Sequence, residues 1–366
     1  MGRPRARVLR ERTGPGEFHH WFSLVCDERK KGRHVDVPLS RRLWLYRRGF
    51  FRSSHELYDL ENDDYRDYLP NSWRYLRTSW INEPFDEAMN NKLFTYWLLG
   101  DHSERLPELH GVCSGRTFYP LGDGLSVEGA PRAFGPALDS LLREERRLVV
   151  KGLRGGGAGA VSTVAWDGAY RLDDECVSFD DVLERLRSLG DWILTAHVDQ
   201  APYAEALYPR SVNTIRAVTM IDPDTGAAFV PIVVHRIGTQ RSGTVDNWSK
   251  GGLSAEVDVD TGVLGRAVQF PYDGKLRWLD EHPTTGEAIE GTAVPGWDSI
   301  RDALLSIAGS IPYVPYVGWD LAVVDDGEFE ILEVNANTDV DVLQVHRPLL
   351  RDERVARFYR HHGVVE

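Results

Sequence analysis

The sequence predicts a protein of the α+β class whose N-terminal region is mostly helical. Residues 18–88 carry aromatic and leucine side chains at helical spacing and lack the alternation of polar and apolar residues that is typical of strands. From Val212 onward the chain is instead rich in strand patterns separated by turns. With 366 residues, 42% of them hydrophobic, the chain is long enough for two or three lobes with substantial cores.

Helical and strand patterns follow one another through the rest of the chain. Apolar side chains at helical spacing predict helices, the first with Asn90 as its N-cap, at residues 90–99, 135–147, 179–189, 297–311 and 354–362. Runs rich in Val, Ile and Leu predict strands at residues 148–151, 161–164, 192–198, 213–221 and 228–237. No repeat of fixed period connects these elements.

A β-hairpin is predicted for residues 317–337. Two apolar runs flank residues 325–327, and a turn centred on Asp-Gly is a strong hairpin signal because glycine accepts the positive φ of a primed turn. Counting outward from a two-residue loop places Asp320 opposite Glu333. Asn335, two residues further along its strand, shares that face.

Two carboxylates that face each other repel, and this repulsion suggests two interpretations of the hairpin. A cation between them would relieve it, and hard oxygen ligands suit Mg²⁺, so Asp320, Glu333 and Asn335 form a candidate metal site. The alternative is a hairpin with a polar, solvated face. The same count places Ala322, Phe329 and Ile331 on this face, which argues against a simple wet surface.

A glycine-rich segment follows the strand that ends at Lys151. Its glycines, which precede a β-branched run, are Gly155, Gly156, Gly157 and Gly159. The backbone N–H groups of such a turn approach an anion closely and the lysine adds a point charge, so a phosphate-gripping loop is one interpretation. A flexible hairpin turn is the other. No Gly-Lys-Ser/Thr follows, and the next element is a strand, so the segment is neither a Walker A motif nor a Rossmann fingerprint.

Composition and charge exclude several classes of protein. No run of about 18 apolar residues occurs, so no transmembrane helix is expected. The net charge of −13 disfavours a nucleic-acid partner, because no general excess of Lys and Arg is available to neutralise phosphates. The N-terminus lacks the apolar segment of a secretory signal. The three cysteines, Cys26, Cys113 and Cys176, form no close pair in the sequence, and this spacing favours a reducing cytoplasm and disfavours a zinc site. The oligomeric state cannot be read from the sequence.

Several motifs occur in a definite order along the chain. A strand with a terminal lysine, the glycine-rich segment and a second strand are followed by SVNTIRAVT at Ser211–Thr219, VDNWSKGG at Val245–Gly252 and the hairpin carboxylates. In this order the motifs resemble the ATP-grasp superfamily, and most closely its sugar-transfer-associated branch. The resemblance covers most of the chain and implies two α+β lobes that grip ATP. It divides the chain into a helical N-terminal region at 1–88, a first lobe at 89–190 and a second lobe at 191–366.

The resemblance also implies roles for individual residues. The spacing of Asp320, Glu333 and Asn335 is that of the magnesium ligands in D-alanine:D-alanine ligases. Lys92 and Lys151 would contact the phosphates of ATP, beneath a lid formed by the glycine-rich segment. Further contacts around the nucleotide would come from Ala196, Val198, Arg236, Gly251 and Gly252. The catalytic residues, near the transferring phosphoryl group or an acidic substrate, would be Arg216, Asn247 and Lys250.

One position departs from the pattern of the superfamily. Thr195-Ala196 stands where many relatives have Gln-Glu, so the resemblance assigns recognition of the adenine edge to the backbone of Ala196 and Val198.

Finally, the resemblance implies an ATP-dependent ligation between two small molecules. A substrate carboxylate would attack the γ-phosphate to give an acyl phosphate and ADP, and an amine would then displace phosphate. Such chemistry needs positioned groups and neutralised charge rather than an activated protein nucleophile, and no Ser-His-Asp or Cys-His set is indicated. Two alternatives remain, namely a kinase that phosphorylates a hydroxyl, with a residue such as Asp246 as base, and a non-catalytic nucleotide-binding protein of a glycan pathway.

Overall fold

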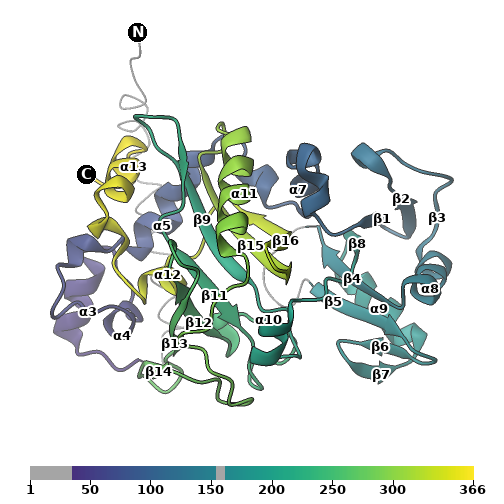
Figure 1. Cartoon of the computed structure of the whole chain (residues 1–366), viewed down its shortest axis with the longest axis horizontal. Helices are drawn as coiled ribbons and strands as arrows, with labels where there is room; N and C mark the ends of the chain where they lie inside the picture. Colours follow the sequence, from purple (N-terminus) through teal and green to yellow (C-terminus); the bar gives the residue numbers. More distant parts are fainter. Residues whose placement is uncertain (1–34, 154–160) are drawn as a thin grey trace, which may run out of the picture.

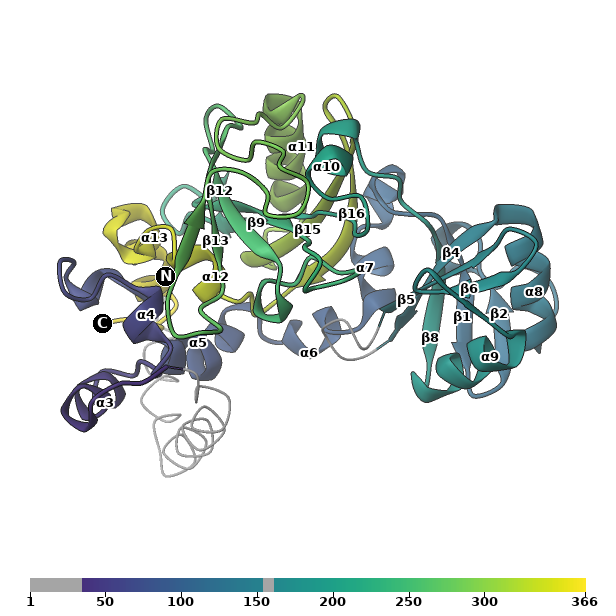
Figure 2. The same cartoon turned by 90° about the horizontal axis from the view of Figure 1, so that it is seen from below.

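The structure, a computed structural model, describes residues 35–153 and 161–366. It contains two antiparallel β-sheets with helices packed against them, which confirms the α+β class and, for residues 35–88, the predicted helical character of the N-terminal region. The first part of that prediction, residues 18–34, lies outside the described residues. A smaller lobe, built on the first sheet, lies beside a larger lobe, and the N-terminal helices lie on the far side of the larger lobe (Figure 1). The two lobes are clearly separate bodies in the view turned by 90° (Figure 2).

The first sheet has the strand order β3-β2-β1-β8-β4-β5-β6-β7. Its strands are β1 Leu109–Ser114, β2 Thr117–Pro120, β3 Arg132–Ala133, β4 Arg147–Gly152, β5 Val161–Trp166, β6 Tyr170–Leu172, β7 Glu175–Val177 and β8 Trp192–Ala196. Helices α8 (Phe134–Glu145) and α9 (Phe179–Ser188) bury Leu142 and Leu186 against this sheet. Because β8 pairs with β1 and β4, the two sheets divide the chain after Ala196, whereas the proposed lobe boundary lies at residue 190.

The second sheet has the order β14-β13-β12-β11-β9-β15-β16, with β10 paired to β9. The strands are β9 Ile215–Ile221, β10 Ala228–Phe229, β11 Val233–Ile237, β12 Leu253–Val257, β13 Leu264–Gln269, β14 Arg277–Leu279, β15 Tyr316–Asp325 and β16 Glu328–Asn335. The single strand predicted over 228–237 is interrupted at Pro231, which has no N–H group to donate to a neighbouring strand.

The second sheet separates two hydrophobic cores, and β9 shows how. Ile215 and Ala217 face a core that contains α11 (Trp297–Ser310), while Val218 and Met220 face a second core on the opposite side. The second core is filled by the N-terminal region and the C-terminal helices: α3 Leu39–Tyr46, α4 Ser54–Leu57, α5 Asn71–Arg77, α12 Asp341–Gln344 and α13 Glu353–His361. The N-terminal region is therefore an integral layer of the larger lobe.

The remaining helical segments are short and link these layers. They are α6 Asp86–Met89, α7 Lys92–Leu98, α10 Pro202–Leu207, η1 Tyr65–Asp67, η2 Thr78–Asn82, η3 Gly100–Arg105, η4 Asp123–Leu125, η5 Trp248–Lys250 and η6 Leu349–Arg351. The prediction of Asn90 as the N-cap of α7 was wrong, because the side chain of Asn91 accepts the N–H of Leu93 (3.0 Å), whereas Asn90 binds back to Asp86. Within the described ranges, none of the helices combines the length and apolar character that crossing a membrane requires.

Strands β15 and β16 form the predicted hairpin. Asp325 pairs with Glu328 beside the turn, and Asp320 pairs with Glu333 toward the open end, as the count from the sequence predicted. Between these pairs the register is displaced by one residue, because a bulge in β15 near the turn is cancelled by a second bulge in β16. The pairing of the two carboxylates is confirmed, although the hairpin is not regular.

The bulges correct the faces predicted for the middle of the hairpin. Phe329 and Ile331 pair with Val323 and Leu321 and lie in the core beneath α11, not on the face of Asp320. The count assumed strict alternation, which the extra residue in β16 interrupts. That displacement turns Glu333 out of the core.

A buried polar cluster fastens the N-terminal region to the segment after the hairpin. Asp341 accepts hydrogen bonds from the hydroxyl of Tyr58 and from Nδ2 of Asn71, the latter at 2.7 Å. Burial, followed by repulsion from Asp339, raises the pKa of Asp341 from 3.8 to about 7, although Tyr58, Arg74 and Asn71 oppose the shift. The folded state therefore holds a proton on Asp341 more tightly than the unfolded chain does.

This cluster predicts a pH dependence of stability. Because the pKa of Asp341 is higher in the folded state, its contribution to the free energy of unfolding decreases as the pH rises from about 4 to about 7 and is constant above that range. In Asp341→Asn this decrease is absent, so urea unfolding at about pH 5 and about pH 8 should differ between variant and wild type. Asp302→Asn, at an exposed position of α11, should behave as wild type. Identical pH dependence in Asp341→Asn and wild type would contradict the assignment.

Candidate functional site

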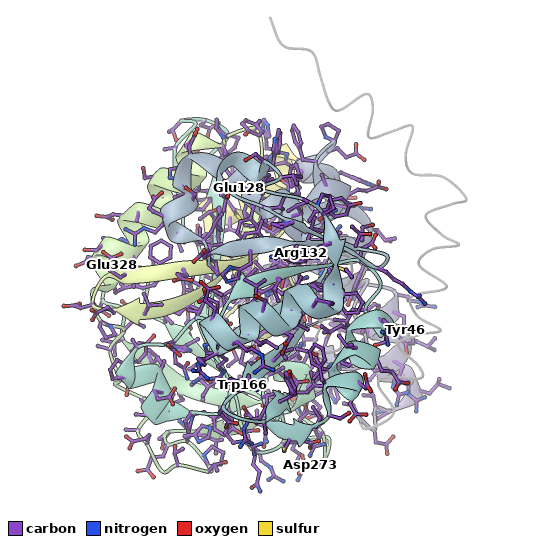
Figure 3. The ribbon with its side chains drawn as sticks, turned by 90° about the vertical axis from the view of Figure 1, so that its right-hand side faces the viewer. Tyr46, Glu128, Arg132, Trp166, Asp273 and Glu328 are labelled. Carbon is purple, nitrogen blue, oxygen red and sulfur yellow. The ribbon has the colours of Figure 1, made fainter. Side chains whose placement is uncertain are left out.

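A cleft of about 460 Å³ lies between the two sheets. The first sheet contributes residues of β4, β5 and β8, and the second sheet contributes β9, β11, β15 and β16. Figure 3, a view onto the smaller lobe, shows Arg132 and Trp166 on that lobe, with Glu328 at the hairpin turn projecting past its edge. Asp320 and Glu333 lie toward the opposite, open end of the hairpin and line the cleft.

Part of the cleft lining is apolar. Its side chains come from β4, β5, β8, the segment after β8 and β16, namely Val149, Val161, Ala196, Val198 and Leu332. Such a surface suits a flat, weakly polar ring better than a charged group.

The charged part of the cleft lining contains a buried ion pair between neighbouring strands. Arg216 of β9 stands directly opposite Asp320 of β15. Its Nε donates to Oδ1 at 2.5 Å and its Nη2 to Oδ2 at 2.9 Å, a bidentate arrangement. Burial disfavours both charges, yet the attraction between them outweighs it, raising the pKa of Arg216 and lowering that of Asp320. Arg236 adds a second cation, with its Nη2 3.3 Å from Oδ2 of Asp320.

Two lysines from other elements also line the cleft. Lys92, at the start of α7, donates from Nζ to Oε1 of Glu333 at 3.2 Å. Lys151 of β4 donates to the carbonyl of Leu332 at 3.3 Å. Burial lowers the pKa of Lys151 to about 8, against the opposing effect of Glu333. An anion bound between the two lysines would favour the protonated, positively charged form of Lys151, which burial disfavours.

The loop between β11 and β12 closes one side of the cleft through Asp246. Its Oδ2 accepts the backbone N–H of Thr214 at 3.0 Å and the hydroxyl of the same residue, and its Oδ1 lies 3.3 Å from Nη2 of Arg236. Gly252 allows this approach, since a Cβ there would lie 2.4 Å from the carbonyl oxygen of Asp246. The loop is thus tied to Arg236, one of the two arginines that contact Asp320.

The structure brings together most of the residues singled out from the sequence. Those that line the cleft are Lys92, Lys151, Ala196, Val198, Arg216, Arg236, Asn247, Asp320, Glu333 and Asn335. Lys250 is exposed in η5 and does not line it, and neither do Gly251 and Gly252, which shape the loop instead. The glycines at 155, 156, 157 and 159 lie outside the described residues.

The backbone N–H of Ala196 is already engaged in a hydrogen bond. Its N–H already donates to the carbonyl of Glu108 at 2.9 Å, because the end of β8 is still bound to the segment before β1. Its own carbonyl accepts the hydroxyl of Thr195 at 3.2 Å. Recognition of a ring by the N–H of Ala196 is therefore excluded in this arrangement.

Some cleft residues were missed although the sequence contains a signal for them. Arg147 and Val149 line the cleft with Lys151, because alternate residues of β4 share one face. Thr163 lines it with Val161 for the same reason on β5. Counting back from Lys151 in steps of two would have identified Arg147 and Val149.

The residues at the open end of the hairpin fit a hard divalent cation. Two carboxylates and an amide oxygen are available at Asp320, Glu333 and Asn335, and all three line the cleft. Both oxygens of Asp320 accept from arginines, but a carboxylate oxygen keeps a further lone pair. Across the described parts of the chain there is no group of three or more His, Cys, Asp or Glu side chains that could hold a metal, so such an ion would depend on Asn335, water or a ligand for further oxygens.

The family match covers the whole of both sheets. Residues 80–354 match the family described as sugar-transfer associated ATP-grasp. The chain belongs to this family. It therefore has the ATP-grasp fold, and its N-terminal residues up to 79 lie outside the match. No curated relative matches the chain.

Solved structures with similarity to this ATP-grasp protein include three ligases or synthetases. The ATP-grasp ligase PsnB complexed with minimal precursor is 16% identical, with a TM-score of 0.36 over 76% of this chain and 64% of that one. The D-alanine-D-alanine ligase from Coxiella burnetii is 11% identical, with a TM-score of 0.38 over 75% of this chain and 59% of that one. PurK, an N5-carboxyaminoimidazole ribonucleotide synthetase solved as its ADP complex, is 10% identical, with a TM-score of 0.37 over 72% of this chain and 52% of that one. The chain thus spans about three fifths of the length of the first solved structures it matches. Membership of the family rests on the sequence match.

The position of Lys151 predicts a role in phosphate binding. Lys151→Ala should weaken ATP binding by about 10- to 100-fold, because a hydrogen bond to a charged group contributes about 1.5–3 kcal/mol. Titration calorimetry with ATP and Mg²⁺ would measure the change. Lys275→Ala, in the exposed turn between β13 and β14, is the matched control and should bind as wild type. Equal affinity in both variants would exclude Lys151 from the phosphate site.

Proposed function

We propose that this ATP-grasp protein is an ATP- and Mg²⁺-dependent ligase that joins a small-molecule carboxylate to an amine through an acyl phosphate. The observation that supports this most strongly is the convergence of Arg216, Arg236, Lys92 and Lys151 on the cleft that the paired carboxylates of the hairpin also line. Phosphoryl transfer depends on positioning and on neutralised charge, and this arrangement provides both. Biosynthesis of a glycan or of a peptide-like metabolite is the proposed setting.

In the proposed reaction the apolar and the charged parts of the lining have different roles. The side chains of Val149, Val161 and Leu332 would contact the adenine ring, and Lys92 and Lys151, which line the same cleft, would contact the phosphates. Mg²⁺, held by Asp320, Glu333 and Asn335, would neutralise negative charge on the phosphates. Arg216 then faces the oxygen atoms that gain charge as the substrate carboxylate attacks.

The bonds of the reaction follow from this placement. A carboxylate oxygen of the substrate forms a bond to the γ-phosphorus while the bond to the bridging oxygen of ADP breaks. The amine then attacks the carbonyl carbon of the acyl phosphate, phosphate leaves, and the amine loses its proton. Both stages pass through states with concentrated negative charge, which the guanidinium groups of Arg216 and Arg236 are placed to stabilise.

The surroundings of Asp246 favour ligation over phosphorylation of a hydroxyl. A kinase of this type needs a base near the substrate hydroxyl. Asp246 accepts two donors from Thr214 through Oδ2 and pairs with Arg236 through Oδ1, so a proton could be taken up only at the lone pair that remains on Oδ1. A carboxylate substrate needs no such base because it is already deprotonated.

The described thiols are compatible with a reducing cytoplasm, which we propose as the site of action. Cys113 is buried and Cys176 is exposed, and both are free. Burial raises the pKa of Cys113 to about 11, which keeps this thiol protonated and unreactive at neutral pH.

Glu333→Gln tests the proposed metal site. The substitution removes one anionic ligand and no core side chain, so ADP release that depends on Mg²⁺ should fall by about 100-fold or more while the melting temperature changes little. Glu328→Gln, on the same strand but beside the hairpin turn and not among the residues that line the cleft, is the matched control and should stay within a few-fold of wild type. Turnover of Glu333→Gln close to that of wild type would refute the metal assignment.

A trapping experiment distinguishes the ligase from its alternatives. Enzyme, ATP and Mg²⁺ are incubated with pools of amino acids, dipeptides and uronic acids in the presence of hydroxylamine, and ADP and hydroxamate are measured together. An acyl phosphate is attacked by hydroxylamine, so the correct pool should yield equal amounts of both products without any natural amine.

The other outcomes each point to a different reaction. A stable phosphate ester without hydroxamate would establish a kinase, and AMP with pyrophosphate would exclude the ADP-forming ligase. Tight ATP binding with no pool-dependent ADP would favour a non-catalytic nucleotide-binding protein.

A further inference from the structure

The N-terminal region reaches the cleft through a loop that follows the hairpin. We call residues 336–340, between β16 and α12, the Thr338 loop. Nη1 of Arg216 donates to the hydroxyl of Thr338 at 2.9 Å, and this bond is buried. Arg216 thus has two kinds of partner, the carboxylate of Asp320 through Nε and Nη2, and the loop hydroxyl through Nη1.

A glycine in β15 makes this contact possible. A Cβ at Gly318 would lie 2.6 Å from Oγ1 and 2.7 Å from Cβ of Thr338. The threonine side chain therefore lies in the space that a side chain at position 318 would take, on the same face of the strand as Asp320. Any larger residue at 318 would push the hydroxyl away from the guanidinium.

The Thr338 loop is held from the other side by the N-terminal region. Arg74 of α5 donates from Nε to the carbonyl of Thr338 at 3.0 Å and from Nη2 to the carbonyl of Asn337 at 2.9 Å. The hydroxyl of Thr78 donates to the side-chain oxygen of Asn337 at 2.9 Å. A fork of two charge-assisted bonds from one guanidinium fixes both the position and the orientation of the loop.

We propose that Arg74 is a positioning residue for the reaction, acting on Arg216 through Thr338. The contacts run in one line, from the helix through two loop carbonyls to a buried hydroxyl and then to the arginine in the cleft. Arg74 and Thr78 precede the part of the chain that matches the family, so the N-terminal region completes a site that the family match alone does not contain. This inference rests on the proposed function only for its kinetic consequence.

Variants along this line give the kinetic test. Thr338→Val keeps the shape of the side chain and removes the hydroxyl, and Arg74→Ala removes the fork. Each should lower kcat by about tenfold, the effect of losing one hydrogen bond to a charged group, with a smaller change in KM for ATP because Arg216 acts on the developing charge. Thr338→Ser retains the hydroxyl and should restore kcat.

The double variant tests whether the two residues act through the same path. Without the hydroxyl of Thr338, the two hydrogen bonds from Arg74 can no longer orient Arg216. The kcat of Arg74→Ala combined with Thr338→Val should therefore be no lower than that of Thr338→Val alone. Multiplied effects would show that Arg74 acts independently of Thr338 and would overturn the proposal.

Arg77 provides a matched control on the same helix. Its Nη1 donates to the carbonyl of Val364 at 3.2 Å, so Arg77→Ala also removes an arginine–carbonyl bond from α5 but leaves the Thr338 loop untouched. Both alanine variants should lower the melting temperature similarly, and only Arg74→Ala should lower kcat per active site, counted by titration with labelled ADP. Equal kcat values in the two variants would leave Arg74 a merely structural residue.

A spectroscopic readout separates this inference from the proposed function. In arginine-labelled protein, the Nε–H signal of Arg216, identified by its absence in Arg216→Lys, reports the orientation of the guanidinium without any substrate. It should shift in Arg74→Ala and in Thr338→Val and stay in place in Arg77→Ala. An unchanged signal in Arg74→Ala refutes the positioning role, whereas a shifted signal in a protein without ligase activity would refute only the function.

Discussion

The buried ion pair between Arg216 and Asp320 constrains much of the larger lobe. Two charges at the centre of a sheet lose their hydration, and the loss is recovered only if the geometry is good and every remaining donor finds a partner. The structure meets both requirements, because Arg216 contacts Asp320 in a bidentate way and donates a further hydrogen bond to the hydroxyl of Thr338, and Arg236 supplies a second cation. Removing one member alone would leave an unpaired buried charge, at a cost of about 3–5 kcal/mol.

That requirement explains why several elements meet at this point. The loop before β12 supplies Asp246, which with Thr214 holds Arg236, and the segment after β16 supplies Thr338. The same groups that satisfy the ion pair also form the polar wall of the cleft. Stability and chemistry therefore depend on one hydrogen-bonded network, in which a change at one residue alters the surroundings of the next.

The electrostatic design is local, because the chain as a whole carries a net charge of −13. Lysines and arginines from both lobes face one cleft, whereas exposed ion pairs elsewhere, such as that of Arg277 with Asp273, contribute little to stability. Concentrating cations where burial weakens screening makes each of them more effective toward an anion than an exposed residue would be. An acidic protein can thus present a local surface that attracts an anion.

Local signals in the sequence were sufficient for the hairpin, for most helices and for ten residues of the cleft lining. The Asp-Gly turn predicted the pairing of Asp320 with Glu333, and this pairing holds because the two bulges of the hairpin cancel each other. The sequence could not reveal Arg74 as a neighbour of Thr338, since the two are far apart in the chain and their contact runs through backbone carbonyls. Lys250 was placed in the site by its neighbours in a motif, but a glycine pair directs the chain so that this lysine remains exposed.

The extra residue in β16 lets one strand serve two surroundings. Before Leu332 the residues that face the core are Phe329 and Ile331, and after it they are Val334 and Ala336, so the parity of the strand changes there. A strand of strict alternation would have to put either a carboxylate into the core or a hydrophobic residue into the site. Substitutions can alter the part of β16 before Leu332 and the part after it separately. The number of residues in the strand cannot change, because it sets which side chains face the core. For anyone who redesigns this protein, chain length in β16 is as much a part of the candidate site as the identity of Glu333.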